Sequence, residues 1–368
     1  MDTNMENTPK IKRESKNKIR VEFERTPLLE RLKARFVSFY FLTNVIWYIF
    51  RLILMIGIAY VVLFPFISKI AASFMPIEDF TDVTVRLIPK NPTLKIYSAI
   101  ITDLGFFKAM FNTFLLSFST AVIQTLICCL IGYGFAKFKF RGNKVLFALV
   151  ILTMIIPPQT LRFGYFMTFR YFDLFKVMTF LTGRLTVGIS WIDSLLGKIH
   201  ILKMSDAGFN FINTPIPFFI LSLTGLAFKN GLYIFLLRQF YRGIPDELEE
   251  SAYLDGAGTF RTFVQIILPL SVSMMITVFL FSFSWQWTDT FYTKLFYTSQ
   301  TPNILTEVVT KVPKTLQLII NENTGGGMYE TAARNTAGIM MIIPLVILYL
   351  FCQRQLVQGI ERSGISAA

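Results

Sequence analysis

Apolar residues in this chain gather in runs about twenty residues long, separated by shorter polar segments. A helix rises about 1.5 Å per residue, so a run of that length crosses the roughly 30 Å hydrocarbon core of a bilayer. About six runs qualify: Leu52–Phe74, Ala109–Ala136, Val145–Phe166, Pro215–Phe240, Leu268–Phe291 and Ala337–Cys352. The pattern therefore predicts an all-α membrane protein with about six transmembrane helices.

Two of these runs contain residues that a membrane helix rarely tolerates. Pro157 and Pro158 remove two adjacent backbone donors from the third run and should bend or end that helix. Lys229 and Asn230 interrupt the fourth run, and polar groups at that depth usually face protein or a water-filled pathway. The sequence leaves open whether they line a pathway, snorkel to the surface or join helices.

Composition supports a lipid environment and explains the basic charge. The 368 residues are 53% hydrophobic and only 16% charged, which is too apolar for a soluble globular chain. The net charge of +13 does not require nucleic acid, because Lys and Arg accumulate on the cytoplasmic side of membrane proteins. About eleven basic residues precede Leu52, and four more fill the short segment 137–144 without an acid. Both segments should therefore be cytoplasmic, and an even number of spans places the C-terminal tail, 356–368, on the same side.

The first fifty-one residues are a basic N-terminal tail. They lack the short apolar core and small-residue cleavage site of a signal peptide, so we expect the first span to stay in the membrane. Residues 27–51 mix aromatic and basic side chains. Two interpretations remain equally open: an amphipathic helix on the membrane surface, or a tail without fixed structure.

Few residues are suited to catalysis or metal binding. Cys128, Cys129 and Cys352 lie inside apolar runs, where free cysteines are mostly inert, and His200 is the only histidine. The chain has no G-x-x-x-x-G-K-[ST] phosphate loop and almost no carboxylates inside its spans. We therefore expect no catalytic residue, no metal and no cofactor bound by this chain.

The segment between the fourth and fifth runs, 241–269, carries the clearest local signals. Pro245 and several acids suit the start of a helix, and Gly256 with Gly258 should end it. A second, apolar arm should then run from Thr259 to Pro269. This helix–glycine–helix elbow lies where polar turns normally link spans, so we interpret it as a surface for docking another protein, with membrane packing as the alternative.

This elbow resembles the EAA motif of the permeases of binding-protein-dependent ABC importers. The matching residues are Glu250, Ser251, Ala252, Gly256, Ile266, Leu268 and Pro269, with the motif's spacing throughout and Ser251 in place of one alanine. Other segments resemble the second permease of the maltose and glycerol-3-phosphate class, among them 87–93, 138–142, 155–159, 235–240, 242–250 and 353–359. The resemblance covers about residues 52 to 360.

The resemblance implies a type I importer (MetI-like) fold in the cell membrane of a prokaryote, with a cytoplasmic coupling helix and cytoplasmic termini. It implies a first helix and outer loop in 52–108 and a core permease domain in 109–355. The implied partners are a second homologous permease, two ATPases that bind ATP and Mg, and an extracytoplasmic binding protein that delivers a sugar. The alternatives are an importer of a peptide, polyol or phosphodiester, and, less favoured, a stand-alone channel.

The same resemblance suggests which residues contact these partners. Contact with the ATPase is expected for Glu249, Glu250, Ser251, Ala252, Asp255, Gly256, Ala257, Phe263, Ile266, Leu268 and Pro269. The substrate pathway is expected to include Lys229, Asn230, Trp285, Trp287, Thr288 and Asp289, where aromatic faces and short polar side chains suit sugar rings. The two tryptophans are equally consistent with an aromatic belt at the membrane interface.

The outer loop 166–213 is longer than the family pattern. Long loops without structure are uncommon in compact domains, so we expect short helices that pack on the outer membrane face. The loop then either contacts the binding protein or simply packs against neighbouring spans.

Overall fold

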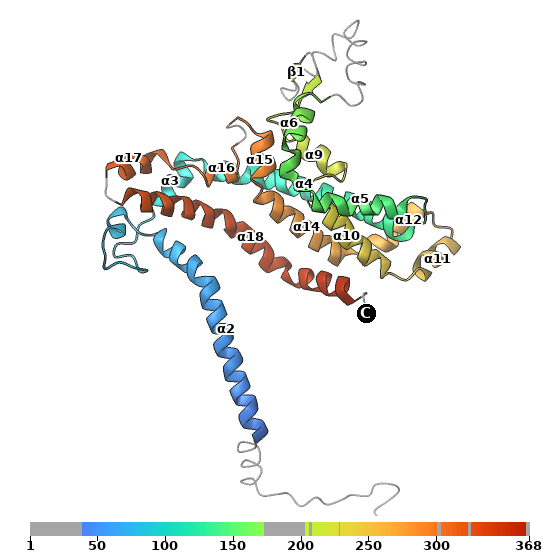
Figure 1. Cartoon of the computed structure of the whole chain (residues 1–368), viewed down its shortest axis with the longest axis horizontal. Coiled ribbons are helices and arrows are strands. Elements are labelled where there is room, and N and C mark those ends of the chain that lie inside the picture. The colour runs from blue at the N-terminus through green and yellow to red at the C-terminus, as the bar shows by residue number, and fades with distance from the viewer. Residues whose placement is uncertain are drawn as a thin grey trace, which may run out of the picture. The chain divides into compact units, whose positions relative to one another are not determined.

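The computed structural model describes residues 39–172, 203–205, 208–227, 229–299, 303–322 and 325–365. The chain divides into two compact units, Met1–Ile67 and Ser68–Ala368. The first unit contains most of helix α2, Phe39–Ala72. The second unit contains the helical body and the remaining elements (Figure 1).

Helix α2 begins at Phe39 rather than at Leu52, so the last part of the expected surface helix belongs to the same continuous helix. Residues 43–50 are mostly apolar or aromatic, and the Arg51 guanidinium lies 5.9 Å from the centre of the Trp47 ring. An arginine whose guanidinium lies over an aromatic ring in this way can be tolerated in a helix that contacts lipid. Large apolar side chains such as Met55 and Val61 are exposed along α2, as expected of a helix that meets lipid.

The second unit is almost entirely helical. Its elements are η1 (Ile77–Phe80), α3 (Lys95–Asp103), α4 (Phe106–Lys137), α5 (Asn143–Ile155), η2 (Pro158–Leu161), α6 (Arg162–Arg170), β1 (Lys203–Ser205), β2 (Gly208–Asn210), α9 (Ile216–Leu223), α10 (Asn230–Arg242), α11 (Glu247–Leu254), α12 (Thr259–Thr262), the π-helix η4 (Phe263–Ile267), α13 (Leu268–Leu270), α14 (Val272–Trp287), α15 (Phe291–Phe296), α16 (Leu305–Val308), α17 (Lys314–Glu322) and α18 (Gly326–Ile365). The strands β1 and β2 form an antiparallel hairpin in which Lys203 pairs with Asn210.

Among the described residues, three helices are long and apolar enough to cross a membrane: Thr43–Ala72, Phe106–Lys137 and Gly326–Gly359. Two bent pairs pass the same test together, so up to five spans meet it. The pair Asn143–Ile155 and Pro158–Arg170 turns by 93° at the prolines, where the sequence predicts a bend.

The second bend and the fourth span differ from the prediction. Thr259–Leu270 and Val272–Trp287 meet at 78°, so the fifth span, expected to start at Leu268, continues past the bend as α14 from Val272. The fourth predicted span is broken into α9 and α10. Gly225 and Lys229 both adopt positive φ in this break, at 73° and 67°, which ends one helix and starts another.

Helix α4 is the centre of the second unit and packs against α9, α10 and α14. The buried amide of Gln124 joins three of these helices: its Nε2 donates to Ser222 Oγ of α9 at 3.3 Å, and Ser282 Oγ of α14 donates to its Oε1 at 2.5 Å. A buried polar group satisfied from two sides fixes the relative position of these helices.

The two ends of the helical body are built differently. Figure 1 shows α11 and α12 at one end and α3 and α17 at the other, with α18 running along the body between them. The described ends of the expanded loop 166–213 form part of an aromatic cluster, in which Phe172 pairs with Phe209 and packs on Phe169 and Phe211. The sequence predicts short helices in the loop 166–213, but its described residues 203–205 and 208–210 form the paired strands β1 and β2 instead. Residues 173–202 of this loop lie outside the described residues.

Two glycines on α4 offer a matched test of helix packing. A Cβ at Gly132 would lie 2.9 Å from Leu237 Cβ and 3.2 Å from Arg238 N, whereas one at Gly134 would meet nothing closer than 4.0 Å. Gly132→Ala should therefore cost about 1–3 kcal/mol through overpacking against α10. Gly134→Ala should be neutral or slightly stabilising, because alanine is the better helix former. The melting temperature of the detergent-solubilised protein measures both, and equal shifts would contradict this packing.

Candidate functional site

The elbow is the most distinctive local structure of the second unit. Helix α11 begins after Asp246, and three acids in its first turn face the positive end of the helix dipole. At its other end, Gly256 adopts φ 79°, its N–H donates to Tyr253 O at 3.0 Å, and the N–H of Ala257 donates to Ala252 O at 2.9 Å. This pair of bonds is a Schellman motif, which requires the left-handed conformation that glycine adopts without strain. The turn is therefore rigidly defined.

The second arm of the elbow contains an irregular turn. It begins at Thr259 after the extended Gly258 and widens into the π-helix Phe263–Ile267 before Leu268–Leu270. Pro269 has no N–H to donate within the helix and crowds the preceding turn, which accounts for the wider winding. The arm ends at Ser271, where α14 turns away.

The elbow has an attachment face and a free face. On the attachment face, Ala252, Phe263 and Ile267 are buried, and the ring of Phe263 lies 4.7 Å from that of Tyr133 on α4. On the free face, Leu254 is 89% exposed and Phe260 is 74% exposed. Two large apolar side chains so fully exposed beside acidic ones indicate a surface that another protein covers.

A buried cation holds the elbow to α4. The side chain of Lys137, at the end of α4, is only 6% exposed. Its Nζ donates to Ile244 O at 2.7 Å and to Asp246 Oδ1 at 2.5 Å, and it lies 3.4 Å from Glu249 Oε1. The Tyr133 hydroxyl donates to Glu249 Oε2 at 3.2 Å. The hydrogen bond and charge of Lys137 lower the pKa of Asp246, so this carboxylate remains ionised at neutral pH.

The structure thus separates the residues expected to contact an ATPase. Glu250, Ser251, Asp255, Gly256 and Pro269 are exposed; Ala257, Ile266 and Leu268 are partly buried; Glu249, Ala252 and Phe263 are buried. The buried group faces the chain's own helices and positions the elbow. The sequence analysis missed the anchoring role of Lys137 and Tyr133, because Lys137 is the first of four basic residues that together read as a positive-inside signal.

The residues expected in the substrate pathway also differ in their burial and in their contacts. The Lys229 ammonium lies 5.1 Å from the centre of the Trp285 ring, so the break between α9 and α10 meets α14 at this pair. Trp287 is 1% exposed and donates from Nε1 to Met341 O at 3.0 Å, which places it in the core beside α18. The Trp287 side chain is therefore inside the chain and not on a free surface.

Asp289 and Thr288 have local structural roles. The Asp289 carboxylate accepts hydrogen bonds from the backbone N–H and the hydroxyl of Thr293, at 2.7 and 3.0 Å, and so caps α15. Thr288 is exposed and donates to Ser284 O at 2.9 Å. Asn230 differs from both: it is 1% exposed, and its side-chain amide has no hydrogen bond among the described residues.

The elbow and its supporting helices match a known family. The profile described as "Binding-protein-dependent transport system inner membrane component" matches residues 128–362. The Arabinooligosaccharides transport system permease protein AraQ of Bacillus subtilis is 24% identical over 82% of this chain and 90% of its own length. The Galactooligosaccharides transport system permease protein GanQ of Bacillus subtilis is 25% identical, over 86% and 94%.

One solved structure has a similar fold. It is a chain of a bacterial ABC transporter involved in the import of the acidic polysaccharide alginate, with a TM-score of 0.58 and 16% identity. The similarity covers 85% of this chain and 97% of that chain. The order of helices in the second unit is therefore shared with an importer permease.

A double-mutant experiment can test the buried ion pair between Lys137 and Glu249. Lys137→Met leaves the Glu249 carboxylate buried without its cation, so we expect a loss of about 3 kcal/mol or more in stability. Lys137→Met combined with Glu249→Leu removes both charges and should recover most of that loss. Lys139→Met, at an exposed position of the same loop, is the control and should change little. Melting of the purified protein measures all three; additive losses in the double variant would contradict the pairing.

Proposed function

The chain belongs to the binding-protein-dependent transport system inner membrane component family, and from this premise we propose that it carries a carbohydrate into a prokaryotic cell. It is a permease subunit of an ATP-driven importer and not an enzyme. The observation that carries the proposal is the elbow at 241–269, which is fixed to α4 on one face and leaves the apolar side chains of Leu254 and Phe260 exposed on the other. A channel that works alone has no use for such a surface.

The ATPase is the partner for this free face. The chain has no phosphate loop of its own, so two separate ATPase subunits would bind ATP and Mg and supply the energy. Leu254 and Phe260 would enter a cleft of one ATPase, with Glu250 and Asp255 beside them. Anchored by Lys137, the elbow would move together with α4 when the ATPases close, which is a two-state change biased by nucleotide.

A second permease and an extracytoplasmic binding protein complete the proposed complex. Many large apolar side chains of α4, among them Phe107, Phe111 and Leu115, are exposed in the single chain. Such surfaces face lipid or a second membrane subunit, and the proposed pathway for the sugar lies between the two permeases.

An oligosaccharide is the favoured substrate. The relatives named for arabinooligosaccharides and galactooligosaccharides cover most of the chain. Within the chain, the expected pathway keeps an accessible aromatic face in the Trp285 ring, which is 47% exposed and lies beside Lys229 at the broken fourth span. An aromatic face with an adjacent polar group suits a sugar ring, and an ionisable residue at such depth is usually functional.

Co-purification tests the ATPase contact. Leu254→Ser should weaken binding of the ATPase by about tenfold, because the variant removes an 89% exposed aliphatic side chain from the free face. Leu94→Ser changes the same residue type at a 63% exposed position, just before α3, and is the control. The measurement is the amount of ATPase retained with the purified permease. Equal retention in both variants would contradict the assignment of the elbow.

Cysteine labelling tests the orientation. With the partly exposed Cys352 replaced by serine, the native thiols left are the buried Cys128 and Cys129. A cysteine at Asn143 should react with an impermeant maleimide only after the membrane is opened, because the basic segment 137–144 should be cytoplasmic. A cysteine at Val83, which is 90% exposed, should react in intact cells. Labelling of the Asn143 site in intact cells would reverse the proposed topology.

A further inference from the structure

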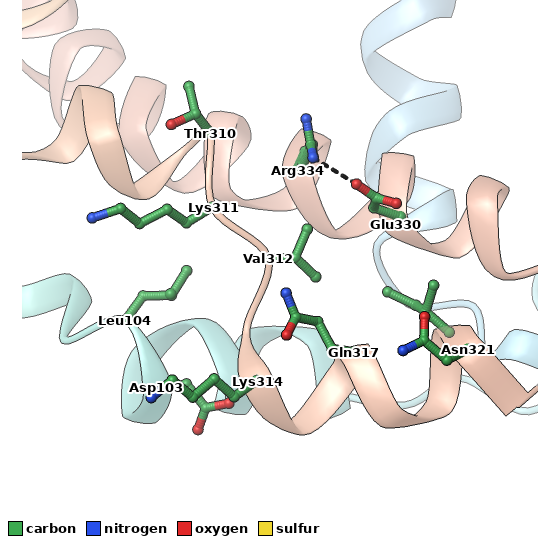
Figure 2. A pocket seen from close by; sticks show the side chains of 11 residues that line it. Asp103, Leu104, Thr310, Lys311, Val312, Lys314, Gln317, Asn321, Glu330 and Arg334 are labelled. Atoms are coloured by element: carbon green, nitrogen blue, oxygen red, sulfur yellow. Dashed lines mark hydrogen bonds and ion pairs between the residues drawn. The ribbon is translucent and has the colours of Figure 1, made fainter. Parts of the chain in front are cut away.

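A polar cleft of about 750 Å³ lies at the end of the helical body opposite the elbow. Its walls come from α3, from the segment before α17, from α17 and from the first turns of α18 (Figure 2). The lining residues are Asp103, Leu104, Thr310, Lys311, Val312, Lys314, Gln317, Ile320, Asn321, Glu330 and Arg334. Five of these are charged and none is aromatic. The volume is within the range of ligand sites in proteins.

The acids of this cleft are already engaged. Arg334 Nη2 donates to Glu330 Oε1 at 2.6 Å on one wall. Asp103, near Lys314 on the opposite side in Figure 2, accepts from the N–H and the hydroxyl of Thr315 at 2.8 and 2.6 Å. These bonds lower the pKa of Asp103, which therefore keeps its charge and its partners at neutral pH.

Donors remain after these bonds are counted. Lys311 lies 3.4 Å from Glu307, outside the cleft, but Lys314 forms no ion pair or hydrogen bond with a described residue. The other two cations of the lining are paired, Lys311 with Glu307 and Arg334 with Glu330, so Lys314 is the lining cation without an ion pair among the described residues. An ammonium in this state in an open cleft can bind an anionic group.

The free donors lie on one face of α17. Lys314, Gln317 and Asn321 are spaced three and four residues apart, so their side chains form one stripe along the helix. All three are exposed, and the side-chain amides of Gln317 and Asn321 form no hydrogen bond with a described residue. Leu316 on another face of α17 is buried in the core and fixes the helix there. The stripe is therefore held in place with its donors free.

We propose that this cleft is a docking site on the outer face of the permease for a carboxylate-bearing segment of the extracytoplasmic binding protein. The inference rests on the proposed function, because the elbow's cytoplasmic position places the opposite end outside. A protein carboxylate fits better than a sugar ring, since the lining offers an ammonium and two amides but no aromatic face. Contacts of this charged, solvent-exposed kind mainly raise the rate and specificity of association.

The test is the dependence of ATP hydrolysis on the concentration of binding protein, in the complete complex reconstituted in nanodiscs. Lys314→Glu places a repelling charge on the stripe, so the concentration of sugar-loaded binding protein that gives half-maximal stimulation should rise about tenfold. Basal hydrolysis and the maximal stimulated rate should stay unchanged, since the cleft lies far from the elbow. The shift should shrink in high salt, which screens exposed charges. Lys314→Gln should give a smaller shift in the same direction.

Lys95→Glu is the matched control. It makes the same charge reversal at an exposed lysine at the start of α3, outside the cleft lining. It should leave the half-maximal concentration unchanged. Equal behaviour of Lys314→Glu and the wild type, or of the two charge reversals, would overturn the docking site and leave the proposed function intact.

Two further outcomes are decisive. Direct binding of free arabinooligosaccharide or galactooligosaccharide to the complex without binding protein, lost in Lys314→Glu, would overturn the docking site in favour of a sugar site. Failure of any loaded binding protein to stimulate the wild-type complex would instead overturn the proposed function, and this inference with it.

Discussion

The buried ammonium of Lys137 constrains the end of the helical body that carries the elbow. Removing a charged group from water costs several kcal/mol unless it finds hydrogen-bond acceptors and an opposite charge. Lys137 finds them in Ile244 O, Asp246 and Glu249, all of which belong to the first part of the elbow. The elbow therefore cannot separate from the end of α4 without leaving a buried charge unpaired. A surface that transmits force needs such an attachment, because a flexible loop would absorb the movement of its partner.

The rest of the architecture continues this rigid connection through the body. Helix α4 runs from Lys137 past Gly132, where α10 approaches closely, to Gln124, which joins α9 and α14. On the proposed function, these contacts would carry movement of the elbow to the helices that flank the broken fourth span. The break at Gly225 and Lys229 is the point where helical hydrogen bonding stops, so it is the natural place for the connected helices to change their relative angle.

The sequence predicted those structural features that depend on residues close together in the chain. The apolar runs, the bend at Pro157–Pro158 and the glycine turn at Gly256 follow from length, missing donors and backbone freedom. The structure contains the bend and the glycine turn, and it contains the apolar runs as helices except for the fourth, which is broken into α9 and α10. Features that depend on distant contacts were not predictable in this way. Lys137 reads as a surface charge until Glu249 is placed beside it, and Trp287 reads as an interfacial residue until its N–H is seen to reach Met341 on α18. Whether such a side chain is buried depends on the distant residue that contacts it, and the periodicity of the sequence does not identify that residue.

The chemistry of the two ends of the body indicates two kinds of association. The elbow presents Leu254 and Phe260, apolar side chains that are costly to leave in water, and interfaces rich in such groups are typical of subunits that stay together. The opposite cleft presents Lys314 and two amides, which remain well hydrated when unoccupied and gain little from permanent burial. In the proposed importer, the ATPase would remain attached through each cycle, while the binding protein would arrive, release its sugar and leave. The difference in polarity between the two ends fits this difference in the lifetime of the two proposed contacts.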